Sequence, residues 1–251
     1  MTNNTQRFTN RVADYVRYRP GYPAALFDFL YGDGGFTPAD VIADCGSGTG
    51  IFTRNLLERG HRVFGIEPNA AMRRAAEEYL HDYPLFVSVA GTAEDSTLPD
   101  HAVNRMVCAQ AFHWFDPVRF RREAERIIRP GGQLALIWNS RISADGIGAE
   151  YERICRETTA EYRQVNHHRL TENDFHRFFG SRSWQRYTWN HQQQLSRAAL
   201  RGRYFSCSYA PAPESPEGRR ADARLHEAFQ RYSDGNIVTF PYCTEMYLVR
   251  M

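Results

Sequence analysis

The sequence predicts an α/β protein in which a mostly parallel sheet lies between layers of helices. Between residues 38 and 142, short apolar segments rich in β-branched residues alternate with amphipathic helical segments. Strands that alternate with helices in this way pair in parallel through right-handed crossovers. A run of glycines, "GSGTG", directly follows the first predicted strand and allows the backbone to approach a ligand there.

Each element of this region has its own pattern. Helices are predicted where apolar residues recur on one face, such as Phe52 with Leu56 and Phe120 with Ala124. These helices cover residues 50–60, 69–80 and 118–128, and "RPGG" at 129–132 is expected to end the last of them. Strands are predicted at residues 40–45 ("DVIADC"), 61–67 ("HRVFGIE"), 85–90 ("LFVSVA"), 105–110 ("RMVCAQ") and 133–139 ("QLALIWN").

The remainder of the chain breaks this alternation. Helices are expected at residues 149–165, 196–206 and 217–232, and strands at 183–196 and 244–250. The first thirty residues contain a helix-like piece and the sequence "YVRYRPGYP", whose prolines interrupt it. This N-terminal segment has no obvious place in the sheet.

Composition limits the classes of function. The chain of 251 residues is long enough for one large domain, or for one domain with a cap, and 42% of its residues are hydrophobic. The formal net charge of +2 argues against a nucleic-acid-binding protein, which usually carries a basic stripe. The sequence contains no lysine, so all 31 basic residues are arginines. Neither a lysine Schiff base nor a phosphate-binding P-loop lysine is therefore possible.

Cysteines, histidines and hydropathy give no sign of a metal site, a signal peptide or a membrane span. The five cysteines include no C-x-x-C pair, which argues against a zinc site or a disulfide framework and fits a reducing cytoplasm. His167 and His168 lie in a polar stretch without a spaced third ligand. The first ten residues are polar, and no apolar run approaches the ~20 residues needed to cross a bilayer. We therefore expect a cytoplasmic protein without metal or membrane contacts.

The glycine loop and one acid indicate a nucleoside-containing cofactor. In a parallel sheet, ligands bind at the carboxyl ends of the strands, where Gly46, Gly48 and Gly50 follow the first strand. Glu67 ends the second strand, and its carboxylate can accept hydrogen bonds from both hydroxyls of a ribose lying across the loop. The simpler alternatives are an ordinary strand–helix turn and a surface acid.

The loop spacing distinguishes between cofactors. It reads G-x-G-x-G, whereas dinucleotide-binding loops read G-x-G-x-x-G and place a pyrophosphate at a helix N-terminus. Asp44 stands beside the loop, where it would repel pyrophosphate but suit the positive ammonium and sulfonium of S-adenosylmethionine. Thr92, Ala93 and Glu94 follow the third strand and are placed to contact an adenine edge. A nicotinamide-dependent oxidoreductase fits less well, because a Tyr-x-x-x-Lys pair is impossible without lysine.

These motifs resemble those of a known family. "VIADCGSGTG", "VFGIEPNAAM", "GTAEDSTLPD", "AQAFHWFD" and "RPGGQLALIWN" occur in the order and spacing of class I S-adenosylmethionine-dependent methyltransferases. "YVRYRPGYP" and "AFHWFD" are similar to a small-molecule group that includes trans-aconitate methyltransferase-like proteins. The resemblance covers residues 11–142. Thr92 departs from it where many relatives have an aspartate for the adenine amino group, and Cys45 where they have an aliphatic residue.

The resemblance implies a particular fold. It is a three-layer α/β/α sandwich, Rossmann-like, with a seven-stranded, mostly parallel sheet and an antiparallel pair formed by the sixth and seventh strands. A helical cap is inserted after strands five and six. The chain is then divided into an N-terminal helical lid (1–37), a cofactor-binding core (38–142), and cap segments with the last two strands of the same sheet (143–251).

The resemblance also implies a set of site residues. The methionine moiety would lie along the glycine loop, the ribose at Glu67 and the adenine at Thr92 and Ala93, with Gln110 near the methyl donor. The expected cofactor contacts are Asp44, Gly46, Ser47, Gly48, Gly50, Glu67, Pro68, Met72, Thr92, Ala93, Glu94, Gln110, Tyr18 and Arg19. The expected substrate contacts are His113, Trp114, Tyr22 and Arg141, with His113 and Gln110 as catalytic residues.

Several of these residues have two interpretations. Tyr15, Tyr18 and Arg19 either form a lid that Tyr22 helps to close, or pack the N-terminal helix on the sheet. Arg141 either grips an acidic substrate group or is a surface arginine. His113 is either a general base or, as we prefer, part of the substrate-binding wall with Trp114.

The sequence thus predicts a methyltransferase with a small-molecule acceptor, a carboxylate or a hydroxyl, and S-adenosyl-L-homocysteine as product. The alternatives are a methyltransferase of a macromolecule, RNA or protein, and a non-catalytic cofactor-binding protein. Amino-methylating DNA enzymes carry [DN]-P-P-[YF] after strand four, where this chain reads "QAFHWF". The Pro-Cys nucleophile of cytosine-C5 enzymes is also missing.

Overall fold

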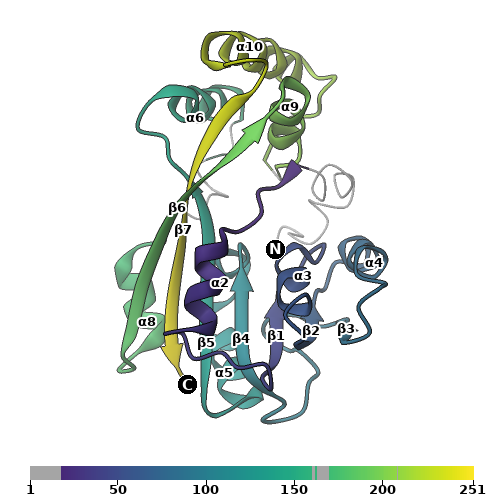
Figure 1. Ribbon diagram of the computed structural model, residues 1–251, viewed down its shortest axis with the longest axis vertical. Coiled ribbons are helices and arrows are strands. Elements are labelled where there is room, and N and C mark those ends of the chain that lie inside the picture. The colour runs from purple at the N-terminus through teal and green to yellow at the C-terminus, as the bar shows by residue number, and fades with distance from the viewer. Residues whose placement is uncertain (1–17, 160–161, 163–169, 208) are drawn as a thin grey trace.

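The computed structural model describes residues 18–159, 162, 170–207 and 209–251 (Figure 1). The chain forms a seven-stranded sheet of order β3-β2-β1-β4-β5-β7-β6. Its strands are β1 (Val41–Cys45), β2 (Arg62–Ile66), β3 (Phe86–Val89), β4 (Val103–Ala109), β5 (Ile128–Arg141), β6 (Trp184–Leu195) and β7 (Val238–Arg250). Strands β1 to β5 pair in parallel, and β7 runs antiparallel to both of its neighbours, β5 and β6. The predicted mostly parallel sheet with an antiparallel β6–β7 pair is confirmed.

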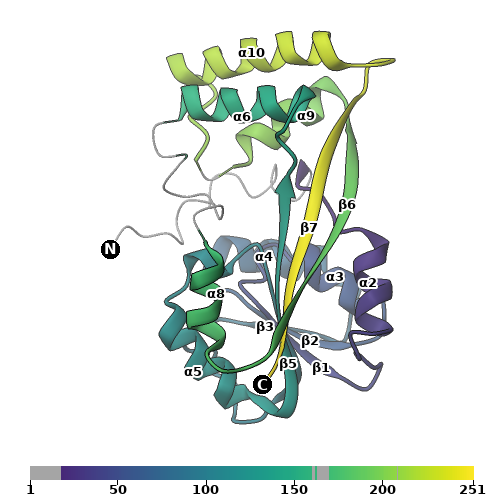
Figure 2. The ribbon, with the colours of Figure 1, turned by 90° about the vertical axis from the view of Figure 1, so that its left-hand side faces the viewer.

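Helices cover both faces of the sheet (Figure 2). One face carries α2 (Ala24–Tyr31) and α3 (Ile51–Leu57), and the other carries α5 (Pro117–Ile127) and α8 (Glu172–Phe179), while α4 (Ala70–Tyr79) contacts β3. Successive residues of a strand point to opposite faces, so Ile42 belongs to the α2–α3 core and its neighbour Ala43 to the α5–α8 core. Both faces of the central strands are therefore apolar, as a buried parallel sheet requires.

The cap has a core of its own on the far ends of the last two strands. It contains α6 (Gly146–Thr158), α9 (Arg197–Phe205) and α10 (Pro216–Tyr232), and β6 and β7 run continuously from the sheet into it (Figures 1 and 2). Val238, Phe240 and Tyr242 of β7 pack there against Tyr151 and Tyr204. Strand β7 is longer than the predicted 244–250, because every second residue of its first half packs into this cap core.

Residues 24–31 are a layer of the core rather than part of a lid. Leu26, Phe27 and Leu30 are buried in the same cluster as Ile42 and Phe52. Residues 18–23 are the part of the expected N-terminal lid that reaches the ligand side of the sheet. Residues 1–17, including Tyr15, lie outside the described residues, as do His167 and His168.

Two other boundaries differ from the prediction. "RPGG" belongs to β5 rather than to a free turn, because the Gly131 N–H donates to the Met251 carbonyl and the Met251 N–H donates to the Gly132 carbonyl. Helix α8 was not expected, although Phe175, Phe178 and Phe179 bury its apolar face. No helix in the described part of the chain is both long and apolar enough to span a bilayer.

Candidate cofactor-binding site

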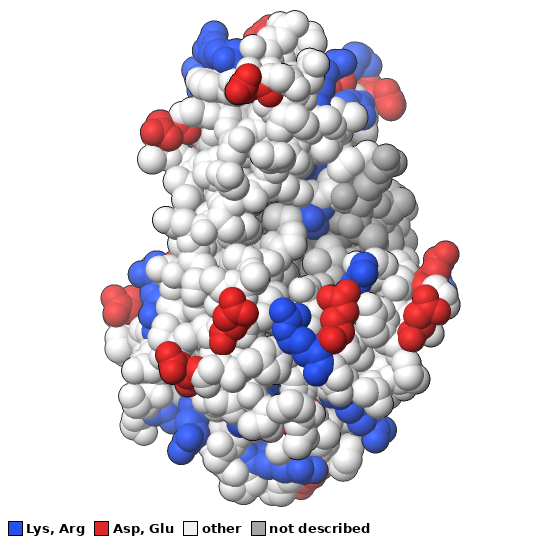
Figure 3. Space-filling view, in the orientation of Figure 1, with Lys and Arg blue, Asp and Glu red and all other residues white. Residues whose placement is uncertain are grey.

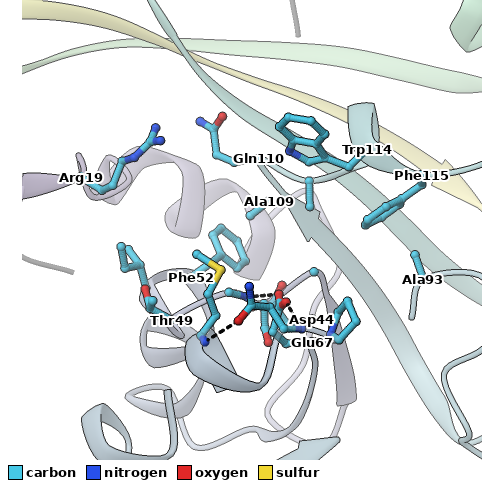
Figure 4. Close-up of a pocket in the computed structure, with 18 of the residues that line it drawn as sticks. Arg19, Asp44, Thr49, Phe52, Glu67, Ala93, Ala109, Gln110, Trp114 and Phe115 are labelled. Carbon is cyan, nitrogen blue, oxygen red and sulfur yellow. Dashed lines mark hydrogen bonds between the residues drawn. The ribbon is translucent and has the colours of Figure 1, made fainter. Parts of the chain in front are cut away.

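A pocket opens at the carboxyl ends of β1, β2 and β4, between the sheet and the cap (Figure 4). Of the predicted cofactor contacts, Arg19, Asp44, Gly46, Ser47, Gly48, Glu67, Pro68, Met72, Thr92, Ala93, Glu94 and Gln110 line it. Trp114 and Tyr22, predicted as substrate contacts, line it as well. Figure 4 shows Asp44 and Glu67 together on one side of the cavity, with Arg19, Gln110 and Trp114 across from them.

The glycines of the loop share one backbone conformation, but Gly48 and Gly50 face different surroundings. All three have positive φ angles, 70°, 58° and 83° for Gly46, Gly48 and Gly50, which favour glycine over other residues. A Cβ on Gly48 would meet nothing nearer than Met72 Cε at 3.9 Å, so this glycine keeps the pocket open. A Cβ on Gly50 would lie 2.7 Å from Leu80 Cδ1. Gly50, predicted as a cofactor contact, instead makes room for packing between α3 and the end of α4.

The amides of the loop are already hydrogen-bonded. The Gly46 and Ser47 N–H groups both donate to the Ile66 carbonyl, at 2.9 and 3.2 Å. The Gly48 N–H donates to Glu67 Oε2 at 3.0 Å, and the Gly50 N–H donates to the Ser47 carbonyl at 3.0 Å. A phosphate-binding loop needs free N–H groups directed at the anion. This loop therefore lacks the donors of a pyrophosphate cradle at these four positions.

Glu67 is held in a fixed orientation at the end of β2. It is buried, and its Oε1 accepts from the Asn69 N–H at 2.8 Å while Oε2 accepts from Gly48. Burial raises the pKa of the carboxyl, although these two backbone hydrogen bonds oppose the rise. Each carboxylate oxygen can accept a second hydrogen bond. Glu67 can thus receive two adjacent hydroxyls without changing its own position.

Asp44 is buried, and only one of its two carboxylate oxygens has a hydrogen-bond partner among the described residues. Its exposed fraction is 0%, and Oδ2 accepts from the Thr53 hydroxyl at 2.6 Å. Oδ1 has no hydrogen-bond partner among the described residues. Burial raises the pKa of this carboxyl to about 7; the Thr53 hydrogen bond opposes the rise and the charge of Glu67 adds to it. A buried carboxylate oxygen without a partner is costly, so this position suits a ligand that brings a cation.

The opposite wall begins at the end of β4. Gln110 has a φ of 62°, a strained angle for a residue with a side chain, and its N–H donates to the Ile137 carbonyl at 2.8 Å. Such strain costs about 1–3 kcal/mol and is concentrated at functional sites. Phe115 and Trp114 continue the wall. Glu94 accepts from the Asp116 N–H at 2.8 Å, so its carboxylate secures the start of α5 as well as lining the pocket.

Three predicted residues lie elsewhere. His113 sits in the short 3-10 helix Phe112–Trp114 and lines a second cavity between α5 and α8, where the Trp138 indole N–H donates to its Nδ1 at 3.4 Å. Tyr18 packs on α9, where a Cβ on Gly202 would lie 2.2 Å from its ring. Arg141 is buried in the cap, where it donates to the Tyr162 hydroxyl at 2.6 Å and pairs with Glu152. The Nη2 group of Arg141 is therefore engaged within the cap, and Arg141 does not line the cofactor pocket.

Several residues that line the pocket were not among the predicted contacts. Phe52 meets Tyr22 edge-on, with ring centroids 4.8 Å apart, and Thr49 is buried beside the glycine loop. Asn69 caps α4, as its place before that helix would have suggested. Arg203 enters from α9, in a part of the sequence that carries no motif. Among the described residues no cluster of metal-ligating side chains occurs.

The sheet order, the glycine loop after β1 and the acid ending β2 together form a Rossmann-like fold, which solved methyltransferase structures share. In agreement, residues 43–136 match the family model described as a methyltransferase domain. An uncharacterized methyltransferase of Mycobacterium tuberculosis is 40% identical over 134 residues, which cover 53% of this chain and 52% of that protein. An uncharacterized methyltransferase-like protein of Schizosaccharomyces pombe is 31% identical over 135 residues, with the same coverage. The matched region thus spans about half the length of these curated relatives.

Solved structures extend the likeness to the cap. A provisionally assigned type II methyltransferase from Anaeromyxobacter dehalogenans superimposes with a TM-score of 0.67 at 24% identity, covering 93% of this chain and 97% of that one. Geranyl diphosphate C-methyltransferase from Streptomyces coelicolor A3(2), solved with S-adenosyl-L-homocysteine, gives 0.52 at 13% identity, covering 91% and 76%. At these identities the likeness establishes the fold.

Proposed function

We propose that the protein is an S-adenosylmethionine-dependent methyltransferase that acts on a small molecule. The observation that carries the proposal is the buried carboxylate of Asp44, whose Oδ1 has no partner among the described residues at a pocket it shares with Glu67. The ammonium and sulfonium groups of S-adenosylmethionine are cations that such a carboxylate favours. Four N–H groups of the glycine loop also favour this cofactor over a dinucleotide. They already donate hydrogen bonds within the protein and are not available to a pyrophosphate.

The residues of the pocket fit this cofactor. Asp44 would accept from the ammonium group and Glu67 from the ribose hydroxyls, while Thr92 and Ala93 adjoin the adenine. When bound, S-adenosylmethionine supplies an activated methyl group. The protein contributes alignment and a site from which water is excluded, here by the apolar side chains of Met72 and other lining residues. That a structural neighbour was solved with S-adenosyl-L-homocysteine supports the same assignment.

A small-molecule acceptor fits the surroundings of the pocket. Residues 19–22 and Arg203 of α9 border it on the side away from the sheet, which restricts access for a macromolecule. Among the described residues on the face drawn in Figure 3, basic and acidic side chains are interspersed rather than gathered in one basic stripe. Nucleic-acid binding normally needs such a stripe. The group that receives the methyl is a carboxylate or a hydroxyl in this proposal, by resemblance to trans-aconitate methyltransferase-like proteins.

Ligand-dependent thermal unfolding tests the cofactor. S-adenosyl-L-homocysteine should raise the melting temperature, because a ligand that binds the native state stabilises it, whereas NAD should leave it unchanged. A shift with NAD and none with S-adenosyl-L-homocysteine would reject the proposal. Transfer of a labelled methyl group across a panel of small metabolites, with total RNA and protein as further acceptors, then distinguishes an enzyme from a non-catalytic binding protein and identifies the acceptor class.

A further inference from the structure

The pocket carries positive charge as well as negative. Arg203 of α9 and Arg19 of the segment before α2 line the same cavity as Asp44 and Glu67. The two acids belong to the sheet, whereas the two arginines come from the cap and the N-terminal segment. The exposed fraction of Arg203 is 2%, so its charge is almost wholly removed from bulk water.

The partners of Arg203 within the protein are uncharged or weakly acidic groups. Its Nε donates to the Tyr242 hydroxyl at 3.2 Å, and its Nη1 donates to Cys207 Sγ at 3.3 Å. No carboxylate of the described residues forms a salt bridge with it, whereas Arg141 in the same cap pairs with Glu152. Burying a cation is costly unless a counter-charge accompanies it. The Cys207 thiol is the only group hydrogen-bonded to Arg203 among the described residues that can supply one. This thiol is also near Arg19 and Arg141, so a ligand anion would offset part of the remaining cost.

Cys207 shows that this region stabilises negative charge. Burial raises the pKa of its thiol, but the positive charges of Arg19, Arg203 and Arg141 outweigh burial and lower it to about 6. Cys155 lies in the same cap core, and burial raises the pKa of its thiol to about 12 despite the opposing charge of Arg141. The positive potential is therefore concentrated near Cys207 and Arg203.

We infer that Arg203 binds a carboxylate or phosphate group of the methyl acceptor, so that the substrate is a small organic anion. The inference rests on the proposed function. The planar guanidinium can hold either group through two parallel hydrogen bonds. The carboxylate of the cofactor is a second source of the same chemistry. We assign it to Arg19 instead, which lines the same pocket from the N-terminal segment, and the S-adenosyl-L-homocysteine affinity of the Arg203 variants tests this division.

Calorimetry on protein saturated with S-adenosyl-L-homocysteine tests the assignment. Succinate and inorganic phosphate are titrated as anion probes, with succinamide as the uncharged counterpart of succinate. The wild-type protein should bind the anions and not the amide. Arg203→Gln should weaken anion binding by at least about tenfold and change the affinity for S-adenosyl-L-homocysteine by less than about twofold. Arg203→Lys should give an intermediate anion affinity, because lysine keeps the charge without the planar fork.

Arg201→Gln is the matched control, because Arg201 lies on the same helix and pairs with Asp222 at the surface. It should leave both affinities unchanged. Loss of S-adenosyl-L-homocysteine affinity in folded Arg203→Gln would overturn the assignment by making Arg203 the partner of the cofactor carboxylate. Equal binding of succinate and succinamide by the wild type would overturn it even if the variants did not fold. Failure of the wild type to bind S-adenosyl-L-homocysteine would instead reject the proposed function itself.

Discussion

At the level of single residues, the proposed binding of a cation at Asp44 is coupled to the protonation of its carboxyl. Its pKa of about 7 in the folded protein lies well above the ~3.9 of an unfolded chain. A raised acid pKa means that the native state binds the proton more tightly. The contribution of Asp44 to stability is therefore lost as pH rises from about 4 to about 7. A cation at Oδ1 would reverse this loss by stabilising the ionised form.

This coupling predicts the pH dependence of binding. The affinity for S-adenosyl-L-homocysteine should fall as pH decreases below about 7, by at most about tenfold per pH unit, because the ammonium group requires ionised Asp44. Calorimetry between pH ~5.5 and ~8.5 measures the slope. Asp44→Asn should bind weakly at every pH and lose the slope. Asp82→Asn, at an exposed position, should keep it. An unchanged slope in Asp44→Asn would assign the titration to another group.

Cys207 gives a second pH-dependent signal. Its thiol should titrate with a midpoint of about 6, while the pKa values of Cys45, Cys108, Cys155 and Cys243 are raised by burial. Thiolate absorbance in the ultraviolet across pH ~4–8 should therefore show one titration, absent from Cys207→Ser.

Arg203→Gln should move that midpoint to higher pH, because it removes one of the positive charges that stabilise the thiolate. Arg201→Gln should leave the midpoint in place. A midpoint near the ordinary thiol value in the wild type would show that the region near Arg203 lacks the positive potential inferred from the structure.

Among the elements, β5 connects the pocket to its surroundings through Asn139. The Asn139 Nδ2 donates to the Gly21 carbonyl at 2.8 Å, and the Gln110 side chain donates to the Asn139 carbonyl at 3.3 Å. The Asn139 Oδ1 accepts from Thr244 of β7 and from His191 of β6. One side chain thus ties the segment before α2 to three strands, although Asn139 itself does not line the pocket.

Asn139→Ala should weaken the binding of S-adenosyl-L-homocysteine several-fold by releasing the segment that contains Arg19 and Tyr22. Hydrogen exchange should show faster exchange at residues 18–23, with little change in β1. Asn190→Ala, at an exposed position of β6, is the control. If exchange at residues 18–23 stayed slow in Asn139→Ala, other contacts would be holding the segment.

At the scale of the whole molecule, two cores share the strands β6 and β7. The apolar clusters on the two faces of the sheet, under α2 and α3 and under α5 and α8, together make up the sheet core, and the cap helices form the cap core. The pocket lies where the two meet, so the residues proposed to bind the cofactor come mainly from the sheet core, and Arg203, proposed to bind the acceptor, comes from the cap. Under the proposed function, the cap would determine the acceptor while the sheet would hold the cofactor.

The two cores should respond differently to cavities. Phe240→Ala removes a fully buried ring that packs edge-on against Tyr151 in the cap, and should cost about 3–5 kcal/mol of unfolding free energy. Where the protein remains folded, its affinity for S-adenosyl-L-homocysteine should change little. Phe120→Ala should weaken that affinity, because Phe120 supports the pocket residue Phe115. Denaturant unfolding and calorimetry measure both effects, and loss of affinity in folded Phe240→Ala would contradict this division.

The sequence by itself determined the sheet and the half of the site that belongs to it. Strand and helix periods depend on residues a few positions apart, and the glycine loop and Glu67 directly follow their strands, so local patterns sufficed. Asp44 was found for the same reason, because it stands beside the loop.

Only the tertiary structure decided which side chains from distant segments meet. Arg203 reaches the pocket because β6 and β7 project beyond the sheet and carry α9 back over it, and no local pattern records that path. His113 and Trp114 are adjacent in sequence, yet one short helical turn directs them to different cavities. Arg141, predicted as a substrate contact, is instead held within the cap by Glu152 and Tyr162. The physical reason is that packing between elements, rather than spacing along the chain, determines the direction of each of these side chains.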